Sequence, residues 1–144
     1  MERVKAIAEE ISWLVPKLLR GLRAGFFAAG QVTTSQMVTL MRIYEKENTR
    51  VGVLSQEMRV SAPTISGVVD RLTRSGYLKR THDRFDRRVV NVELTNKGKK
   101  LVENLLSEIQ KRWYTILLHL TDEERENYLK ILKRIVEVLN KEYA

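Results

Sequence analysis

The chain has 144 residues, of which 43% are hydrophobic, and it carries a formal net charge of +8. This length suits one domain with a buried core, and no apolar run approaches the roughly 20 residues that a membrane-spanning helix needs. Because it has no cysteine and only two histidines, His82 and His119, disulfides, thiolate catalysis and a metal site of His and Cys ligands alone are excluded. We therefore expect no cofactor, no metal and no membrane partner. The charged N-terminus has no signal-peptide core, which favours a cytoplasmic location.

The N-terminal segment predicts one long helix. Between residues 4 and 26 apolar side chains recur at three- and four-residue steps, the spacing of an amphipathic helix. Towards its end they form a broad apolar surface, made of Leu18, Leu19, Leu22, Phe26 and Phe27. Such a surface needs another apolar element to cover it.

Two shorter helices are predicted next. Thr33 and Gln36 have the spacing of a capping box, and they precede a helical pattern over about 34–46. After a polar stretch, a short helix is expected at about 52–58, with its apolar residues facing inward.

The following segment completes a helix-turn-helix. The pair 59–60 forms the turn, Ser61 caps the next helix, and Pro63 lies in its first turn, where a missing N–H costs little. Gly76 is the expected stop. Residues 52–75 therefore read as two helices joined by a tight turn.

A two-stranded hairpin with a charged tip, typical of a wing, is predicted after Gly76. Strands are expected over 77–81 and 88–94, because apolar and polar residues alternate in the second, and the polar loop 82–87 joins them. The segment 71–100 holds ten basic and three acidic residues, a balance of +7. This concentration of charge favours a polyanionic partner, with a merely solvated basic face as the alternative.

The remainder predicts two more helices. Apolar residues run at helical steps over 101–120, and Thr121 with Glu124 forms a second capping box at the start of a helix over 122–142. One small chain cannot easily bury the apolar faces of all its terminal helices, so we expect a homodimer. Packing within the chain alone is the alternative.

The wing and the helix-turn-helix carry several motifs. The wing has the pattern Asp-x-Arg-x5-Leu-Thr, in Asp86, Arg88, Leu94 and Thr95, with Gly98 following. Further segments are Val53–Ser61, Val69-Asp70-Arg71-Leu72 and Gly76-Tyr77-Leu78. Together these segments resemble the multiple-antibiotic-resistance regulator (MarR) family, whose wing pattern is matched at every fixed position. The resemblance extends over the whole chain in helix order and length, and its wing motif is specific.

The expected fold is mainly α with a small two- or three-stranded β-wing, a winged helix-turn-helix whose N- and C-terminal helices form a dimerisation region. We expect an N-terminal dimerisation helix over 1–32, a DNA-binding lobe over 33–95 and C-terminal dimerisation helices over 96–144. The resemblance implies a homodimer that binds double-stranded DNA at a pseudo-palindromic operator, usually as a repressor. It also implies a response to a small aromatic or phenolic effector.

Two groups of residues are candidates for DNA contact. A recognition helix must present short polar groups to the major groove, and its candidates are Ser61, Ala62, Pro63, Thr64, Ser66, Gly67 and Arg71. A helix cap alone is the alternative for Ser61. Gly67 departs from the family, which often has a longer polar residue there.

The wing tip supplies the second group, the arginines Arg84, Arg87 and Arg88. Arginine is favoured in a narrow, electronegative minor groove. A solvated loop is the alternative for these three residues. By resemblance Asp86 orients the wing arginine, and Arg88 is the fixed member of the motif. From its place at the end of the recognition helix, we expect Asp70 to be a structural carboxylate that could pair with a basic residue of the wing.

An effector pocket is the least defined expectation. Its candidates are Trp13, Phe26, Phe27, Met37, Met41 and Trp113, with core packing as the alternative for each. Three other functions compete with a regulator: a non-specific DNA-coating protein, an RNA-binding domain and an enzyme. The strands carry no aromatic stacking platform for RNA, and no catalytic residue is predicted because phosphate-loop, nucleophile-elbow and HExxH motifs are absent.

Overall fold

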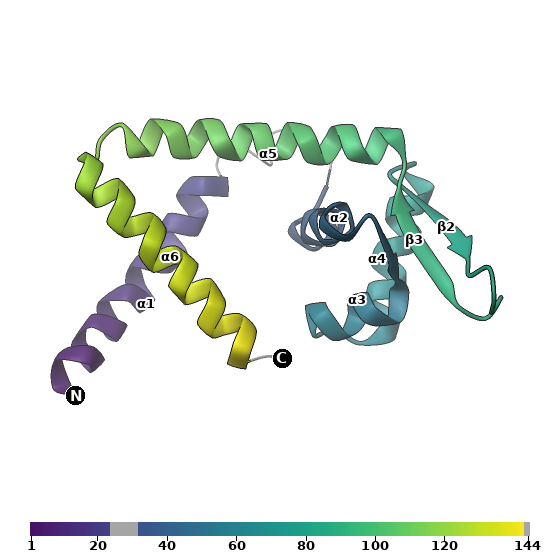
Figure 1. Ribbon diagram of the computed structural model, residues 1–144, viewed down its shortest axis with the longest axis horizontal. Helices are drawn as coiled ribbons and strands as arrows, with labels where there is room; N and C mark the ends of the chain where they lie inside the picture. The colour runs from purple at the N-terminus through teal and green to yellow at the C-terminus, as the bar shows by residue number, and fades with distance from the viewer. Residues whose placement is uncertain (24–31, 143–144) are drawn as a thin grey trace. The chain divides into compact units, whose positions relative to one another are not determined.

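The computed structural model describes residues 1–23 and 32–142, which form six helices and three strands (Figure 1). In chain order they are α1 (Glu2–Arg23), α2 (Thr34–Lys46), β1 (Asn48–Arg50), α3 (Val51–Met58), α4 (Ala62–Arg74), β2 (Leu78–His82), β3 (Val90–Leu94), α5 (Asn96–Leu117) and α6 (Asp122–Glu142). The chain divides into two compact units, Met1–Glu108 and Ile109–Ala144. The predicted fold class is confirmed, whereas the domain boundaries drawn from the sequence stay a prediction.

The hydrophobic core lies in the first unit and joins α2, α3, α4, the sheet and the beginning of α5. Its buried side chains are Leu40, Ile43, Leu54, Ile65, Val68, Val69, Leu72, Leu78, Val92, Leu94, Leu101, Val102 and Leu105. The four that come from α4 lie at helical steps on one face of that helix. The opposite face of α4 is therefore free to meet a partner.

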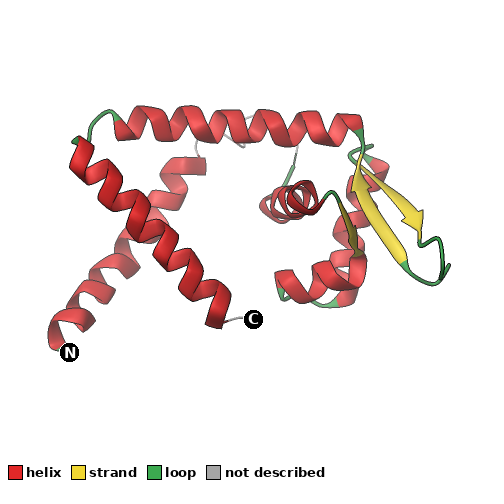
Figure 2. Ribbon diagram, in the orientation of Figure 1, coloured by secondary structure: helices red, strands yellow, loops and turns green. Residues whose placement is uncertain are grey.

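The sheet has the order β1-β3-β2, and both pairings are antiparallel (Figure 2). Leu78 of β2 pairs with Leu94 of β3, and Thr49 of β1 pairs with Val92 on the other side of β3. The sequence pattern did not indicate β1, because three residues are too few to display an alternation. The strand β3 begins at Val90, two residues later than predicted, since the preceding residues belong to the turn of the wing.

Two residues with a left-handed backbone conformation shape the turns on either side of α4. Arg59 ends α3 with φ 53°, and the N–H groups of Arg59 and Val60 return to carbonyls in the last turn of that helix. Gly76 follows α4 with φ 82°, and the next N–H, that of Tyr77, reaches the carbonyl of Leu72 at 2.9 Å. Both endings reverse the chain sharply, which fixes α4 between a tight turn and the wing.

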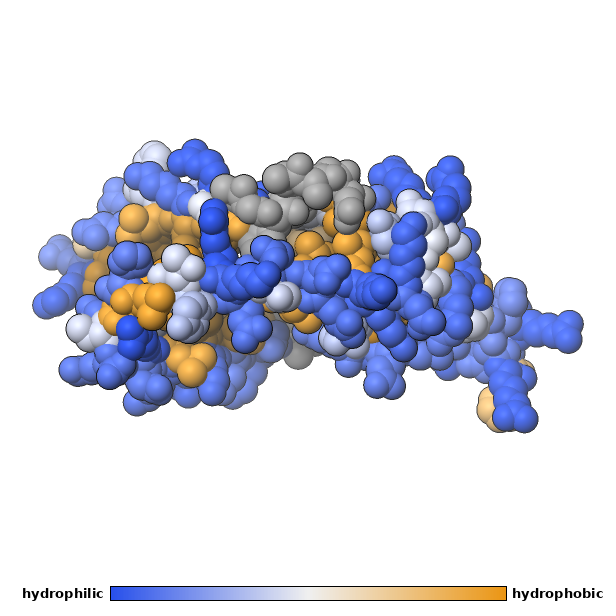
Figure 3. All heavy atoms as spheres, turned by 90° about the horizontal axis from the view of Figure 1, so that it is seen from above, coloured by the Kyte–Doolittle hydropathy of each residue, from blue (hydrophilic) through white to orange (hydrophobic). Residues whose placement is uncertain are grey.

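The part of the first unit from α2 to the beginning of α5, which holds this core, is called the lobe below. The terminal helices differ from the lobe, because neither α1 nor α6 contains a buried residue. Large apolar side chains stay exposed along both, so apolar atoms reach the surface among charged ones (Figure 3). The predicted capping box of α6 is confirmed, with Thr121 N–H donating to the Glu124 carboxylate at 2.8 Å. In the parts of the chain that the structure describes, no helix has the length and apolar character to cross a membrane.

Candidate nucleic-acid interface

The recognition helix α4 presents a polar N-terminal end to solvent. Ser61 caps it by accepting the N–H of Thr64 at 3.3 Å, and the two hydroxyl groups lie 2.7 Å apart. Of the residues predicted to meet the major groove, Ser61, Ala62, Pro63, Thr64 and Arg71 are exposed, and Ser66 and Gly67 are half-buried. The capping role of Ser61 is thus observed, and the residue itself stays exposed.

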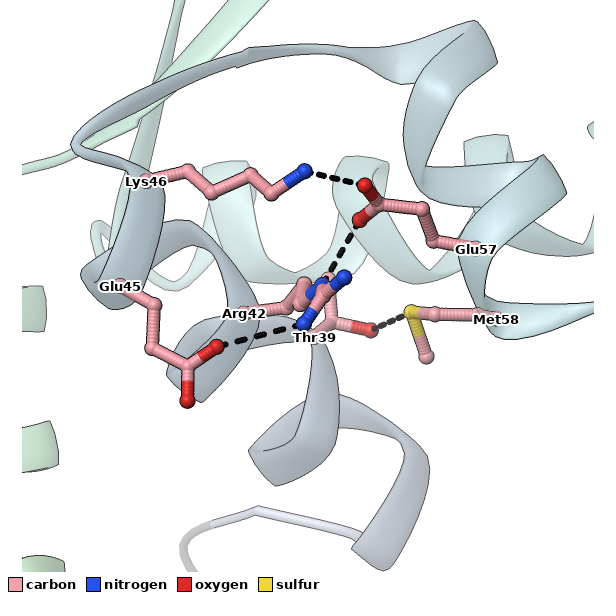
Figure 4. Close-up of polar contacts among 6 residues, drawn as sticks. All are labelled: Thr39, Arg42, Glu45, Lys46, Glu57 and Met58. Carbon is pink, nitrogen blue, oxygen red and sulfur yellow. Dashed lines mark hydrogen bonds and ion pairs between the residues drawn. The ribbon is translucent and has the colours of Figure 1, made fainter. Parts of the chain in front are cut away.

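A charged cluster holds α3 against α2 (Figure 4). The Glu57 carboxylate accepts a hydrogen bond from Arg42 Nε at 2.7 Å and a second from Lys46 Nζ. These bonds, the one from Arg42 first, lower the pKa of Glu57 below its ordinary value. Beside them the buried hydroxyl of Thr39 contacts the sulfur of Met58 at 3.4 Å. Because α3 also packs on α4, the cluster helps to fix the recognition helix.

The wing, defined as residues 78–94, is tied to the recognition helix by an ion pair. The Arg80 guanidinium of β2 donates to the Asp70 carboxylate of α4. The sequence predicted that Asp70 could pair with a basic residue of the wing, and this pair confirms it. Side chains of a strand alternate between faces, so Arg80 lies on the same face as buried Leu78 and can reach the helix.

The turn of the wing is organised by two carboxylates. Asp86 accepts the backbone N–H of Arg88 at 3.0 Å and its Nε at 3.2 Å. The hydrogen bonds from the side chain and then the backbone of Arg88 hold the pKa of Asp86 below its usual value. Asp83 accepts the N–H of Phe85 at 2.8 Å and lies 3.8 Å from a guanidinium nitrogen of Arg50 in β1. The loop is therefore held at both sides, which fits the orienting role predicted for Asp86.

The arginines of the wing stay accessible in this arrangement. Arg84, Arg87 and Arg88 are all exposed, and Figure 1 shows the loop that carries them at the free end of the β2–β3 hairpin. A hollow of about 430 Å³ separates the wing from the start of α3, and Arg50, Gln56 and Arg88 contribute to its lining. One unit of the chain thus offers a polar helix end, a basic hairpin tip and a basic hollow between them.

Three features of this surface escaped the sequence analysis. Arg80 was not singled out as the partner of Asp70, and the carboxylate of Glu57 was not linked to α2, because such partners are distant in sequence. Phe85 was also passed over, although an aromatic residue within a charged loop is a visible signal. Its side chain is 95% exposed.

The residues predicted to line an effector pocket belong to different parts of the chain. Met37 and Met41 are partly buried against the core of the first unit, and Trp13 on α1 is 71% exposed. Trp113 belongs to the second unit, where its ring centroid lies 5.5 Å from that of Tyr128. Phe26 and Phe27 fall outside the described residues. The role of all six candidates in ligand binding stays a prediction.

Comparisons with known proteins point to one family. The model of the MarR family matches residues 32–90. The uncharacterized HTH-type transcriptional regulator YfiV of Bacillus subtilis is 34% identical over 110 residues, covering 74% of this chain and 69% of that protein. The HTH-type transcriptional repressor YetL of the same organism is 26% identical over 128 residues, covering 88% of this chain and 77% of that protein.

Solved structures also match the fold of this chain. The crystal structure of Streptococcus pneumoniae FabT in complex with DNA superposes with a TM-score of 0.78 at 22% identity, covering 96% of this chain and 98% of that one. At this identity the match concerns the fold. The matched family model spans the elements that form the surface described above, from α2 to the beginning of β3.

Proposed function

This chain belongs to the MarR family of winged helix-turn-helix transcriptional regulators, and we propose that it is a sequence-specific repressor that binds a pseudo-palindromic DNA operator as a homodimer. Members of this family are transcription regulators and not enzymes. The repressor role is supported by the name of the relative YetL, and the DNA partner by the FabT complex. The proposal includes a cytoplasmic location, because the chromosome of the bacteria named above lies there.

The observation that carries the proposal is the Asp70–Arg80 ion pair between the recognition helix and the wing. It joins a helix with an exposed polar end to a hairpin with three exposed arginines. A helix of this kind enters the major groove, and arginines on a narrow hairpin suit the adjacent minor groove. Phosphate contacts by the same basic residues supply affinity through counterion release.

Dimerisation is supported by the exposed apolar faces of α1 and α6. Burying them against a second copy would place two recognition helices at a fixed separation, as an inverted-repeat operator requires. Occupying such a site in front of a gene blocks transcription.

The direct test is selection of bound duplexes from a random pool. We expect an inverted repeat whose half-sites lie about one helical turn apart. Sedimentation over a concentration series should give a species of twice the chain mass of 16.8 kDa. Recovery of DNA without any shared sequence would instead indicate non-specific coating of DNA.

The wing is tested by replacing Arg88 with alanine. Loss of one good arginine contact should weaken operator binding by about 1–3 kcal/mol and leave the fold intact. Lys5→Ala, which removes the same charge from α1, is the control and should bind as the wild type does. Equal binding by the two variants would show that the wing assignment is wrong.

The proposal extends to release of DNA by a small aromatic or phenolic ligand. The support is the family resemblance. Both tryptophans of the chain, Trp13 and Trp113, are among the residues that the sequence predicts for the pocket. Titration with a set of benzoates and phenols should quench tryptophan fluorescence and lower operator affinity in parallel. Quenching without a change in affinity would separate ligand binding from regulation.

A further inference from the structure

Phe85 is an aromatic side chain held outward at the tip of the wing. It is 95% exposed, so its ring adds almost no hydrophobic burial to the fold. Its backbone is nevertheless fixed, since its N–H donates to the Asp83 carboxylate at 2.8 Å and Asp83 itself pairs with Arg50. The turn therefore presents this ring from a defined position.

The ring is surrounded by positive charge. Arg84 precedes it, Arg87 and Arg88 follow shortly after, and all three are exposed. The only nearby carboxylates in the described loop, those of Asp83 and Asp86, are engaged by hydrogen bonds within the turn. A partner that suits this tip has negative charge at its rims and apolar surface between them.

We propose that Phe85 packs into the minor groove of the operator, against deoxyribose and base edges, and wedges at a flexible base step beneath the wing tip. The inference rests on the proposed function and adds a specificity-determining residue to it. The minor groove is about 6 Å wide and is bordered by phosphates, which matches an aromatic ring flanked by arginines. Apolar side chains inserted there partly unstack a base step and kink the duplex.

The wedge gives the wing a way to read sequence without hydrogen bonds. Pyrimidine–purine steps unstack easily, whereas A-tracts are stiff. The energy of opening the step under Phe85 therefore depends on which step it is. Because Gly67 offers no side chain for base contacts in α4, such indirect reading by the wing would add to the discrimination that the helix supplies.

Salt dependence distinguishes the ring from the arginines. An aromatic contact releases no counterion, whereas each arginine–phosphate contact contributes about one unit to the slope of log K against log salt. Affinity should be measured at several salt concentrations for the wild type, Phe85→Ala, Phe85→Leu and Arg88→Ala, using the operator selected from the random pool. Melting temperatures should be equal for the wild type and both Phe85 variants, because the ring is exposed.

We expect Phe85→Ala to bind about tenfold more weakly, which corresponds to about 1.4 kcal/mol, with an unchanged salt slope. Phe85→Leu should retain most of the affinity, since leucine also serves as a wedge. Arg88→Ala should lower both the affinity and the slope. Replacing the base step under the wing tip, located by footprinting, with part of an A-tract should weaken the wild type more than Phe85→Ala.

Two outcomes overturn the inference in different ways. If Phe85→Ala binds as the wild type does while Arg88→Ala is impaired, the ring makes no contact and the proposed function stands. If the wild type binds no duplex at all, the proposed function and the role of Phe85 are both wrong. A loss in Phe85→Ala accompanied by a lower slope would mean that the substitution displaces the arginines, and it would also overturn the wedge.

Discussion

The recognition helix and the terminal helices have equally regular apolar patterns but very different surroundings. α4 has 13 residues and buries four of them, whereas α1 with 22 residues and α6 with 21 bury none. A helical repeat of apolar residues defines which face will be buried, but the burial itself requires a neighbour. In the lobe the sheet and α2 supply that neighbour. The chain alone thus closes the lobe, whereas the apolar faces of its terminal helices stay exposed, as the proposed dimer requires.

The largest expected effect comes from a charge placed on the face of α1. Leu18 is 42% exposed in the single chain, and in a two-fold dimer a Leu18→Glu substitution buries two unpaired carboxylates. We expect the dissociation constant of the dimer to rise about a thousandfold or more, equivalent to about 4 kcal/mol. Sedimentation equilibrium measures this directly, and the lobe should stay folded by circular dichroism.

The neighbouring residue offers a matched control. Lys17→Gln changes the net charge by the same amount but alters a polar position of α1, so the dimer should persist. If both variants dimerise like the wild type, the face of α1 that carries Leu18 is not in the interface. If the wild type is itself a monomer at micromolar concentration, the explanation of the exposed faces by a second copy fails.

The second largest effect is expected in the lobe, whose core the chain closes without a partner. A Cβ built on Gly98 at the start of α5 would lie 2.1 Å from the carbonyl oxygen of Tyr77, far inside van der Waals contact. Gly98→Ala must therefore shift the backbone that joins β3 to α5, and we expect a loss of about 2–3 kcal/mol in the free energy of unfolding. Urea denaturation followed by circular dichroism measures it. Gly52→Ala, whose added Cβ meets nothing within 4 Å, should unfold at the wild-type urea concentration or slightly above.

The same two regions show what the sequence can predict. Periodicity placed α2 and α6 at their observed bounds, and the capping residues Thr33 and Thr121 marked their starts, because these signals lie within a few residues of one another. In α4 the buried residues Ile65, Val68, Val69 and Leu72 recur at helical spacing. A helix with one buried face must present the other, and five of the seven DNA-contact candidates predicted from the sequence are exposed, whereas Ser66 and Gly67 are half-buried.

What the sequence could not give is contact between distant residues. The strand β1 exists because Thr49 pairs with Val92, more than 40 positions later. Gly98 is recognisable in the motif, but its close approach to the carbonyl of Tyr77 depends on the assembled sheet. The partner of Asp70 was foreseen only as some basic residue of the wing. Long-range pairing thus decides the details of the site, while local pattern decides its elements.

The smallest expected effect concerns the charged cluster that supplements the apolar core of the lobe. The Glu57 carboxylate accepts hydrogen bonds from Arg42 and Lys46 of α2, and its side chain is 22% exposed. Its pKa in the folded chain lies below the ordinary value of 4.5, chiefly because of the hydrogen bond from Arg42. A lowered carboxylate pKa means that the unfolded chain binds more protons at acid pH, so the stabilisation is present above about pH 4.5 and is lost as the pH falls below it.

Glu57→Gln should therefore lower the free energy of unfolding by about 0.5–1 kcal/mol near pH 7, the range for partly exposed ion pairs. The difference from the wild type should shrink towards zero near pH 3, because protonated Glu57 resembles glutamine. Urea denaturation at both pH values measures it, with Glu45→Gln as the control, since Glu45 makes one exposed contact with Arg42 at 3.3 Å. An equal loss at both pH values would mean that shape and not charge holds α3 on α2. In that case the lobe would be closed by apolar packing alone, and its contrast with the open faces of α1 and α6 would rest entirely on where apolar neighbours are available.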